Sequence, residues 1–322
     1  MNRELGVAVC GYQKAVCKAG APPPTDGLER SAPTRLERSA RILLSLSGRV
    51  RAYNMGCVAS SLLLVMVCAN GCDIGGLQSK FAFHPPQASY ALKRATSRDG
   101  ENTLEVVDEE LRPTPSPLVT LRMRYVRTSR SQEIAVFHFI HEAAELTLLW
   151  SHGNAMDCGE ILVFLQDLSL RLGVSVVVYD YAGYGASSGR PSEASTYADI
   201  EAVHGYLNGD GGVPDEKLVV VGQSVGSGPS LWLVERHRGV RGLWLQSSLL
   251  SGLRVLAPDP ICSLGGFCGP PCAFGLCDIF PNLRRVRRVH CPVLIMHGTH
   301  DDVIHPSHSE ELHRLCPARY LI

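Results

Sequence analysis

The chain has 322 residues, which is enough for one large α/β domain or two ordinary ones. Its 31 basic residues (Lys and Arg) equal its 31 acidic ones, and 45% of its residues are hydrophobic. The balanced charge argues against a protein that binds nucleic acid through a broad basic field, and the hydrophobic content argues against an intrinsically disordered chain. No uninterrupted apolar run reaches the roughly 18 residues that a membrane-spanning helix requires.

Residues 1–54 show no helix or strand periodicity and carry nine Lys and Arg against four Asp and Glu. This composition, with three consecutive prolines at 22–24, predicts a disordered basic extension. A transit peptide is the alternative, because Arg and Ser are present, but four acidic residues are atypical of such peptides.

Residues 55–95 have the features of a lipid-anchored segment. Met55-Gly56-Cys57 has the form of an N-myristoylation signal with an adjacent cysteine that can be acylated. Myristoylation requires Gly56 to be N-terminal. Either translation starts at Met55 and residues 1–54 are an artefact of gene prediction, or only Cys57 is available for acylation. The apolar stretch at 58–69 is too short to span a bilayer, and a Pro-rich linker at 80–86 follows it.

Residues 96–322 form the predicted globular domain, in which short apolar strands alternate with helices. This alternation predicts an α/β fold with a mostly parallel sheet and helices on both faces. On the first helix, the buried face is expected to carry Ile161, Leu165, Leu168 and Leu172. In chain order, strands are expected at 133–140, 146–151, 174–180, 217–222, 242–246 and 292–297, and helices at 160–172, 194–207, 225–237 and 307–315.

The sequence Gly222-Gln223-Ser224-Val225-Gly226 predicts a nucleophile elbow, a tight strand-to-helix turn that presents a reactive serine. The flanking glycines avoid clashes that side chains would cause, and the backbone N–H of Val225 is expected to bind an oxyanion. A second Gly-x-Ser-x-Gly pattern centres on Ser187, but it lies within a predicted loop. The strand before Ser224 and the helix after it therefore favour Ser224 as the nucleophile.

Two further segments fit the same type of site. His152-Gly153-Asn154-Ala155 follows the strand at 146–151, where such a fold supplies the second oxyanion donor, so Asn154 and Ala155 are candidate donors. Alone, this pattern is also typical of a strand-terminating turn with a hydrogen-bonded histidine. Catalytic serine, acid and histidine are expected in that order along the chain. Asp301, which follows the last predicted strand, stands where the acid is expected, and Asp302 is the less favoured candidate.

Together these residues resemble a known family. The resemblance is carried by residues 80–86, 151–155, 180–193, 197–200, 222–229, 297–299 and Asp301. Over most of residues 78–320, the chain looks like the alpha/beta-hydrolase domain-containing protein 17 family. The resemblance implies an α/β-hydrolase fold in which Ser224 is the nucleophile and Asp301 the acid of a catalytic triad.

Members of this family are serine hydrolases that remove palmitate from S-acylated proteins. The resemblance therefore implies that the partners of this chain are S-acylated proteins and a membrane surface, but not nucleic acid. It implies a reaction that needs no metal and no organic cofactor. It also implies a peripheral, lipid-anchored protein on the cytosolic face of the plasma membrane or endosome, held by acylation at Gly56 and Cys57.

The chain departs from the family in a Gly/Pro/Cys-rich insertion at about 255–285, which is expected to lie over the site and to influence substrate selection. Its four cysteines are separated by five, three and four residues, so they contain no C-x-x-C pair of the kind that binds zinc. The insertion either holds a zinc site or carries loop thiols that are available for acylation. These cysteines are Cys262, Cys268, Cys272 and Cys277.

A second departure concerns the catalytic histidine, which in this family follows a strand after the helix at 307–315. The sequence ends within that strand, so the C-terminal strand is expected to be incomplete and the chain nearly inactive. The histidines before it lie on the acid turn or its helix: His300, His305, His308 and His313. Two alternatives remain, namely a non-catalytic interaction protein on the same fold and a carboxylester or aminopeptidase-like serine hydrolase.

Overall fold

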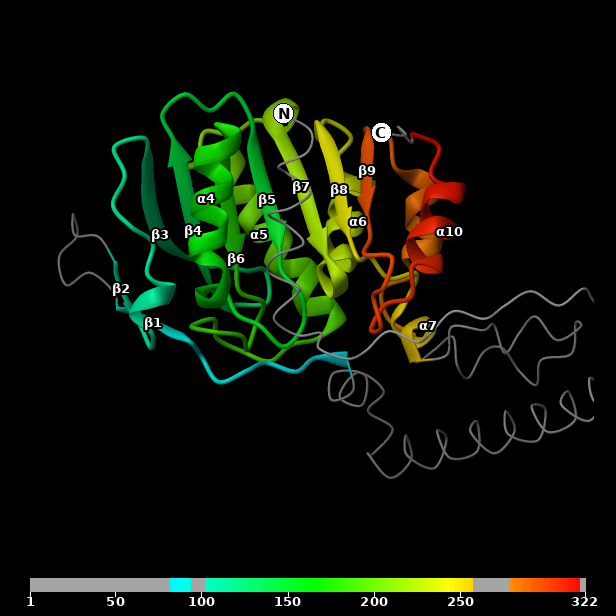
Figure 1. Ribbon diagram of the computed structural model, residues 1–322, viewed down its shortest axis with the longest axis horizontal. Coiled ribbons are helices and arrows are strands. Elements are labelled where there is room, and N and C mark those ends of the chain that lie inside the picture. Colours follow the sequence, from blue (N-terminus) through cyan, green and yellow to red (C-terminus); the bar gives the residue numbers. More distant parts are fainter. Residues whose placement is uncertain (1–81, 94–101, 257–277, 319–322) are drawn as a thin grey trace, which may run out of the picture. The chain divides into compact units, whose positions relative to one another are not determined.

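The computed structural model describes residues 82–93, 102–256 and 278–318. The predictions for residues 1–54, for Gly56 and Cys57, for the cysteines between 262 and 277 and for the end of the C-terminal strand lie outside them. Within the described residues, a seven-stranded sheet has the order β3-β4-β6-β5-β7-β8-β9 (Figure 1). Its strands are β3 (Val119–Arg127), β4 (Glu133–His141), β5 (Thr147–Ser151), β6 (Ser175–Tyr179), β7 (Leu218–Gln223), β8 (Gly242–Gln246) and β9 (Val293–Met296).

The sheet is mostly parallel, as predicted. Strands β6, β5, β7, β8 and β9 pair in parallel, whereas β4 pairs antiparallel with both β3 and β6. Every residue of β5 and β6 is buried, because central parallel strands are covered on both faces. The six predicted strands agree with the observed ones to within two residues at each end.

Helices cover both faces of the sheet, which confirms the predicted α/β architecture. Helix α4 (Leu162–Leu172) lies on the near face in Figure 1, and α5 (Glu193–Asn208) and α6 (Ser227–Arg236) lie behind the sheet. Side chains of the strands alternate between the two faces. Thus Val176 of β6 packs with the core under α4, whereas its neighbour Val177 packs with the core under α5 and α6.

Leu172, the last residue of α4, is 39% exposed, so the prediction that it lies on the buried face was wrong. The helix ends at this residue, and Gly173 caps it in a left-handed conformation.

The other helices and turns are short. Among the described residues, the remaining helices are α7 (Gly252–Leu256), α9 (Asn282–Arg285) and α10 (Ser307–Leu315), and the 3-10 turns are η1 (Glu109–Leu111), η2 (Gly159–Ile161), η3 (Asp215–Lys217), η4 (Ser224–Gly226) and η5 (Val286–Arg288).

Residues that precede the predicted start of the globular domain at residue 96 also pack into this fold. Phe83 and Tyr90 are buried in the two hydrophobic cores. A small antiparallel sheet joins β1 (Tyr90–Lys93) to β2 (Thr103–Val106). Burial of these two aromatic side chains stabilises the attachment of this segment to the domain.

The carboxyl ends of the parallel strands meet at one edge of the sheet. The register pairs Gln223 with Gln246 and Gln246 with Met296, so the residues that follow β7, β8 and β9 leave the sheet side by side. His152 after β5 and Asp180 after β6 leave it at the same edge. In open α/β sheets this edge is where ligands bind, so it is the place to look for a site.

None of the helices among the described residues is both long enough and apolar enough to cross a membrane.

Candidate active site

Ser224 lies on a strained turn between β7 and α6, as the motif predicts. Its φ angle is +51°, a left-handed conformation that costs energy in any residue with a side chain. A Cβ on Gly222 would lie 2.8 Å from Ser227 Cα, and a Cβ on Gly226 would lie 2.8 Å from the His152 carbonyl oxygen. Both glycines are therefore required because backbone passes too close for a side chain.

Hydrogen bonds of Ser227 and Asn282, which no sequence pattern indicates, hold this turn. Ser227 Oγ donates to the Ser224 carbonyl oxygen (2.6 Å) and accepts from Asn282 Nδ2 (3.1 Å). Asn282 Nδ2 also donates to the Leu249 carbonyl oxygen (2.9 Å), and Asn282 is fully buried. The turn is thus tied to α9 and to the loop after β8, whereas no group among the described residues hydrogen-bonds to Ser224 Oγ itself.

The second candidate serine, Ser187, has a structural role. It is buried, its Oγ donates to the Asp180 carbonyl oxygen (2.9 Å), and the same Oγ accepts from the Ala135 N–H (2.9 Å). The hydroxyl therefore ties the loop after β6 to β4 and is not presented to a substrate. Of the two Gly-x-Ser-x-Gly patterns, the one centred on Ser224 alone forms a strand-to-helix turn.

Ser187→Ala should therefore lower stability without removing the reactive serine. The substitution leaves the Ala135 N–H buried without a partner, which costs about 1–3 kcal/mol. Urea denaturation should show this loss, and a fluorophosphonate probe should still label the folded variant. Unchanged stability would contradict the structural role.

The loop after β5 holds the candidate oxyanion donors Asn154 and Ala155. Asn154 Oδ1 accepts from the His84 N–H (3.0 Å) and from the Tyr184 hydroxyl (2.7 Å), and its Nδ2 donates to the Ala82 carbonyl oxygen (2.9 Å). Because these bonds hold both polar atoms of the Asn154 side chain, its backbone N–H is the expected donor to an oxyanion. Ala155 has a φ of +54°, so the loop turns sharply directly after it.

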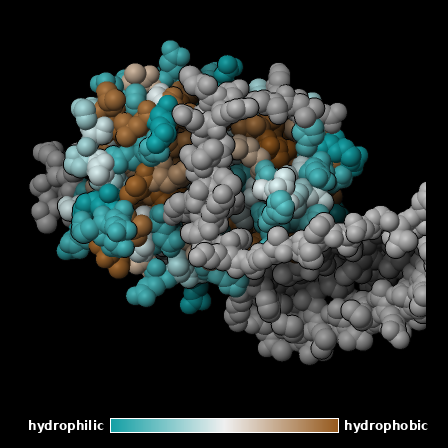
Figure 2. Space-filling model, viewed as in Figure 1, coloured by the Kyte–Doolittle hydropathy of each residue, from teal (hydrophilic) through white to brown (hydrophobic). Residues whose placement is uncertain are grey.

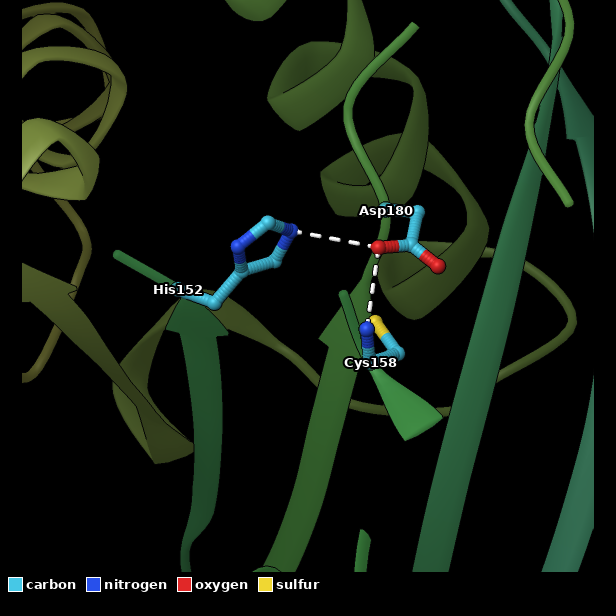
Figure 3. A group of neighbouring side chains, drawn as sticks. All are labelled: His152, Cys158 and Asp180. Carbon is cyan, nitrogen blue, oxygen red and sulfur yellow. Dashed lines mark hydrogen bonds and ion pairs between the residues drawn. The ribbon is translucent and has the colours of Figure 1, made fainter. Parts of the chain in front are cut away.

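His152, at the start of this loop, is fully buried beside Asp180 (Figure 3). Its Nε2 lies 3.3 Å from Asp180 Oδ1, close enough for an ion pair but not aligned as a hydrogen bond. Its Nδ1 lies 2.8 Å from the Gly153 carbonyl oxygen, and Tyr181 donates to the His152 carbonyl oxygen (2.6 Å). These contacts fix the loop that carries the two candidate donors.

Asp180 is the centre of the buried polar group in Figure 3. Its Oδ1 accepts from the Cys158 N–H (3.0 Å), and its Oδ2 accepts from the Tyr90 hydroxyl. Burial, and next the charge of Asp180, raise the pKa of the Cys158 thiol well above its usual value. Cys158 is therefore a neutral thiol, and the group fixes the loops after β5 and β6.

The turn after β9 presents Asp301. Its Oδ1 accepts from the N–H groups of Val303 (3.0 Å) and Ile304 (2.9 Å), and its Oδ2 lies 3.5 Å from His297 Nε2. Two backbone donors fix this carboxylate in place, whereas Asp302 is exposed to solvent. The geometry agrees with the preference for Asp301 over Asp302.

The described residues place Ser224 and Asp301, the candidate nucleophile and acid, at the same edge of the sheet but bring no histidine to Ser224 Oγ. His308 is buried and accepts from the Leu250 N–H at Nδ1 (3.1 Å), and burial lowers its pKa. His300 and His305 are exposed and contact neighbouring side chains of their own turn. His313 lies on α10.

The buried carboxyl of Asp199 on α5 makes stability depend on pH. Burial raises the pKa of Asp199 from 3.8 to about 7, against the opposing effects of the hydrogen bond from the Ala182 N–H and of the Arg130 charge. Between about pH 4 and 7 the folded state therefore keeps a proton that the unfolded chain has lost. The contribution of Asp199 to stability is largest below about pH 4 and falls by about 4 kcal/mol as the pH rises to about 7.

Asp199→Asn should remove this loss, because an amide carries no charge to bury. Between about pH 5 and pH 8, the free energy of unfolding of the variant should rise by about 3 kcal/mol relative to the wild type. Urea denaturation of both proteins at the two pH values measures the difference. A difference that does not change with pH would contradict the raised pKa.

Comparisons with known proteins bear on the fold and on the family of the chain. A family model described as "alpha/beta hydrolase fold" matches residues 147–263. The Alpha/beta hydrolase domain-containing protein aho-3 of Caenorhabditis elegans is 38% identical over 244 residues, which cover 74% of this chain and 68% of that protein. The human Alpha/beta hydrolase domain-containing protein 17B is 36% identical over 265 residues, which cover 81% of this chain and 87% of that protein.

A solved structure supports the fold alone. The esterase Pf2001 of Pyrococcus furiosus superposes with a TM-score of 0.51 at 14% identity, covering 73% of this chain and 87% of the esterase. The fold predicted from the resemblance is thus confirmed. With its matches to curated relatives over most of their length, the chain is a hydrolase that belongs to the alpha/beta-hydrolase domain-containing protein 17 family.

Proposed function

We propose that this hydrolase uses Ser224 to cleave palmitoyl thioesters of S-acylated proteins. The observation that carries the proposal is the left-handed turn at Ser224, which holds a serine hydroxyl without a hydrogen-bond partner among the described residues at the carboxyl edge of the sheet. A strained backbone that is fixed on several sides is typical of a functional residue. The assignment of palmitate as the acyl group rests on the family to which the chain belongs.

In the proposed reaction, Ser224 Oγ attacks the thioester carbonyl carbon while a histidine base takes its proton. The carbonyl oxygen becomes an oxyanion, which the N–H groups of Val225 and of the Asn154–Ala155 loop bind. The carbon–sulfur bond then breaks, the base returns the proton to the thiolate, and the palmitoyl group remains on Ser224. Water activated by the same base hydrolyses this ester and releases palmitate.

Asp301 is the proposed partner of that base. Its two backbone hydrogen bonds orient the carboxylate, so it can stabilise an imidazolium that forms during the attack. Because the described residues bring no histidine to Ser224, the identity of the base is left to the family resemblance, which assigns it to a position after α10.

A series of acyl substrates tests the proposed substrate class. The folded chain should hydrolyse a palmitoylated cysteine peptide faster than the acetylated peptide, a p-nitrophenyl ester or an aminoacyl amide, with kcat/KM as the measure. Imidazole is added in a parallel series as an external base. Faster hydrolysis of the ester or the amide would favour a carboxylester or aminopeptidase-like hydrolase. If no substrate were hydrolysed, with or without imidazole, a non-catalytic interaction protein would be favoured.

We also propose that the protein is held at a cytosolic membrane surface by lipids on Gly56 and Cys57. One myristoyl chain binds a membrane only marginally, and a second acyl chain makes the attachment durable. Expressed from Met55 in cells, the protein should fractionate with membranes, and Gly56→Ala or Cys57→Ser should release most of it. Ser61→Ala, just outside the signal, is the matched control; equal membrane fractions for all four proteins would contradict the anchor.

A further inference from the structure

A cluster of nitrogen and oxygen donors lies between α5 and the end of α6, apart from the residues of the candidate active site. Glu201 and His204 lie one turn apart on one face of α5, and His237 directly follows α6. One ligand atom from each of the three side chains lies within 4.8 Å of the other two. The two imidazole rings are 4.0 Å apart between centroids.

One pair of donors in this cluster, His237 and Glu201, already has about the spacing of two ligands of one ion. His237 Nε2 lies 3.1 Å from Glu201 Oε1 and 3.2 Å from Oε2. Two ligand atoms of a four-coordinate zinc ion lie about 3.4 Å apart, because zinc binds imidazole nitrogen at about 2.0–2.1 Å. The three ligand atoms lie within 4.8 Å of one another, so closing the remaining gaps to about 3.4 Å would place all three donors around one ion.

A fourth residue supplies the outer contact that is typical of metal-binding histidines. Asp215 Oδ1 lies 2.7 Å from His204 Nε2, and Asn208 Nδ2 donates to the same oxygen (3.1 Å). A carboxylate held on Nε2 in this way orients the ring, which leaves Nδ1 of His204 for an ion.

We propose that Glu201, His204 and His237 bind a divalent transition-metal ion, with zinc as the expected ion. Two imidazoles and one carboxylate suit zinc and its neighbours in the first transition row rather than magnesium or calcium. The His204 side chain is 5% exposed, whereas those of His237 and Glu201 are 25% and 43% exposed. An ion can therefore enter from solvent and complete its coordination with water.

The ion would join α5 to the end of α6. His237 lies at the opposite end of α6 from Ser224, about 20 Å away along the helix axis, so the site is structural rather than catalytic. Binding to the folded state alone raises the melting temperature by mass action. This proposal does not depend on the proposed hydrolysis.

Titration of the full chain with zinc chloride tests the proposal. The chain has 12 cysteines, so its accessible thiols are first alkylated with iodoacetamide to prevent zinc–thiolate binding. Calorimetry should then show one tight site per chain, and zinc should raise the melting temperature. Cobalt in place of zinc should give visible absorption bands that report nitrogen and oxygen ligation.

Single substitutions identify the ligands. Glu201→Gln and His237→Gln, both at partly exposed positions, should each weaken binding by at least about 100-fold, and Asp215→Asn by about 10–100-fold. His290→Gln removes an exposed histidine outside the cluster and should leave the affinity unchanged. If the two ligand variants bind zinc as tightly as His290→Gln does, or if the wild type shows no tight site, the cluster consists of ion pairs only and the proposal is wrong.

Discussion

Gly226→Ala should lower the free energy of unfolding by at least about 4 kcal/mol and abolish hydrolysis. The new Cβ would meet the Ser151 carbonyl group and lie 2.8 Å from the His152 carbonyl oxygen, so it meets backbone rather than a flexible side chain. To accommodate it, the Ser224 turn must move away from the end of β5, which separates the nucleophile from the oxyanion loop. Urea denaturation and turnover of a palmitoyl thioester measure the two effects.

Gly205→Ala is the matched control for this prediction. Gly205 lies within α5, and a Cβ built on it meets no atom within 4 Å. Alanine in a helix restricts the unfolded chain more than glycine does, so this variant should gain about 0.5–1 kcal/mol. A Gly226→Ala variant as stable as Gly205→Ala would show that the turn is not packed as tightly as described.

Ser224→Ala should abolish the imidazole-dependent turnover of a palmitoyl thioester while leaving the fold intact. The hydroxyl makes no hydrogen bond with the described residues, so its removal breaks none of the contacts that hold the turn. Steady-state turnover, with and without added imidazole, measures the loss. Ser187→Ala serves as the control, because that serine stabilises the loop after β6 and is expected to leave turnover of the folded protein in place.

Retained turnover in Ser224→Ala would contradict the proposed nucleophile. If turnover were lost in Ser187→Ala while the variant remained folded, the structural role assigned to Ser187 would also be wrong. The two variants therefore separate the two Gly-x-Ser-x-Gly patterns by function, as the structure separates them by geometry.

The sequence predicted the central strands because their burial leaves a continuous apolar signal. β6, with every residue buried, is an example. By contrast, three strands were not predicted. Strand β3 lies at the side of the sheet and alternates polar and apolar residues from Leu121 to Arg124, so it has no continuous apolar run. Strands β1 and β2 have only four residues each. The alternation of strands and helices was sufficient to predict a mostly parallel sheet covered by helices, but not to predict the antiparallel pairing of β4 with β3 and β6.

The candidate site was predictable where it depends on local sequence. The turn at Ser224 needs two nearby glycines, which the motif contains, and its context distinguished it from Ser187. The supporting contacts join distant parts of the chain: Asn282 braces Ser227, and Tyr90 donates to Asp180 from 90 residues away. No periodicity or spacing encodes such contacts, because they depend on how the elements pack.

The same reasoning applies to the proposed metal site. The spacing of Glu201 and His204 places both on one face of a helix, which a sequence can indicate. His237 reaches them only because α6 packs beside α5, and Asp215 reaches His204 from a separate turn. The third donor and the outer carboxylate therefore required the structure.

The most direct test of the account is to find which serine reacts with a fluorophosphonate probe. The folded chain is labelled in the presence of imidazole, digested and analysed by mass spectrometry. The account predicts the probe on the peptide that contains Ser224, and no label in Ser224→Ala. A probe found on Ser187, persistent labelling of Ser224→Ala, or no labelling of the folded wild type would contradict the claim that Ser224 is the nucleophile.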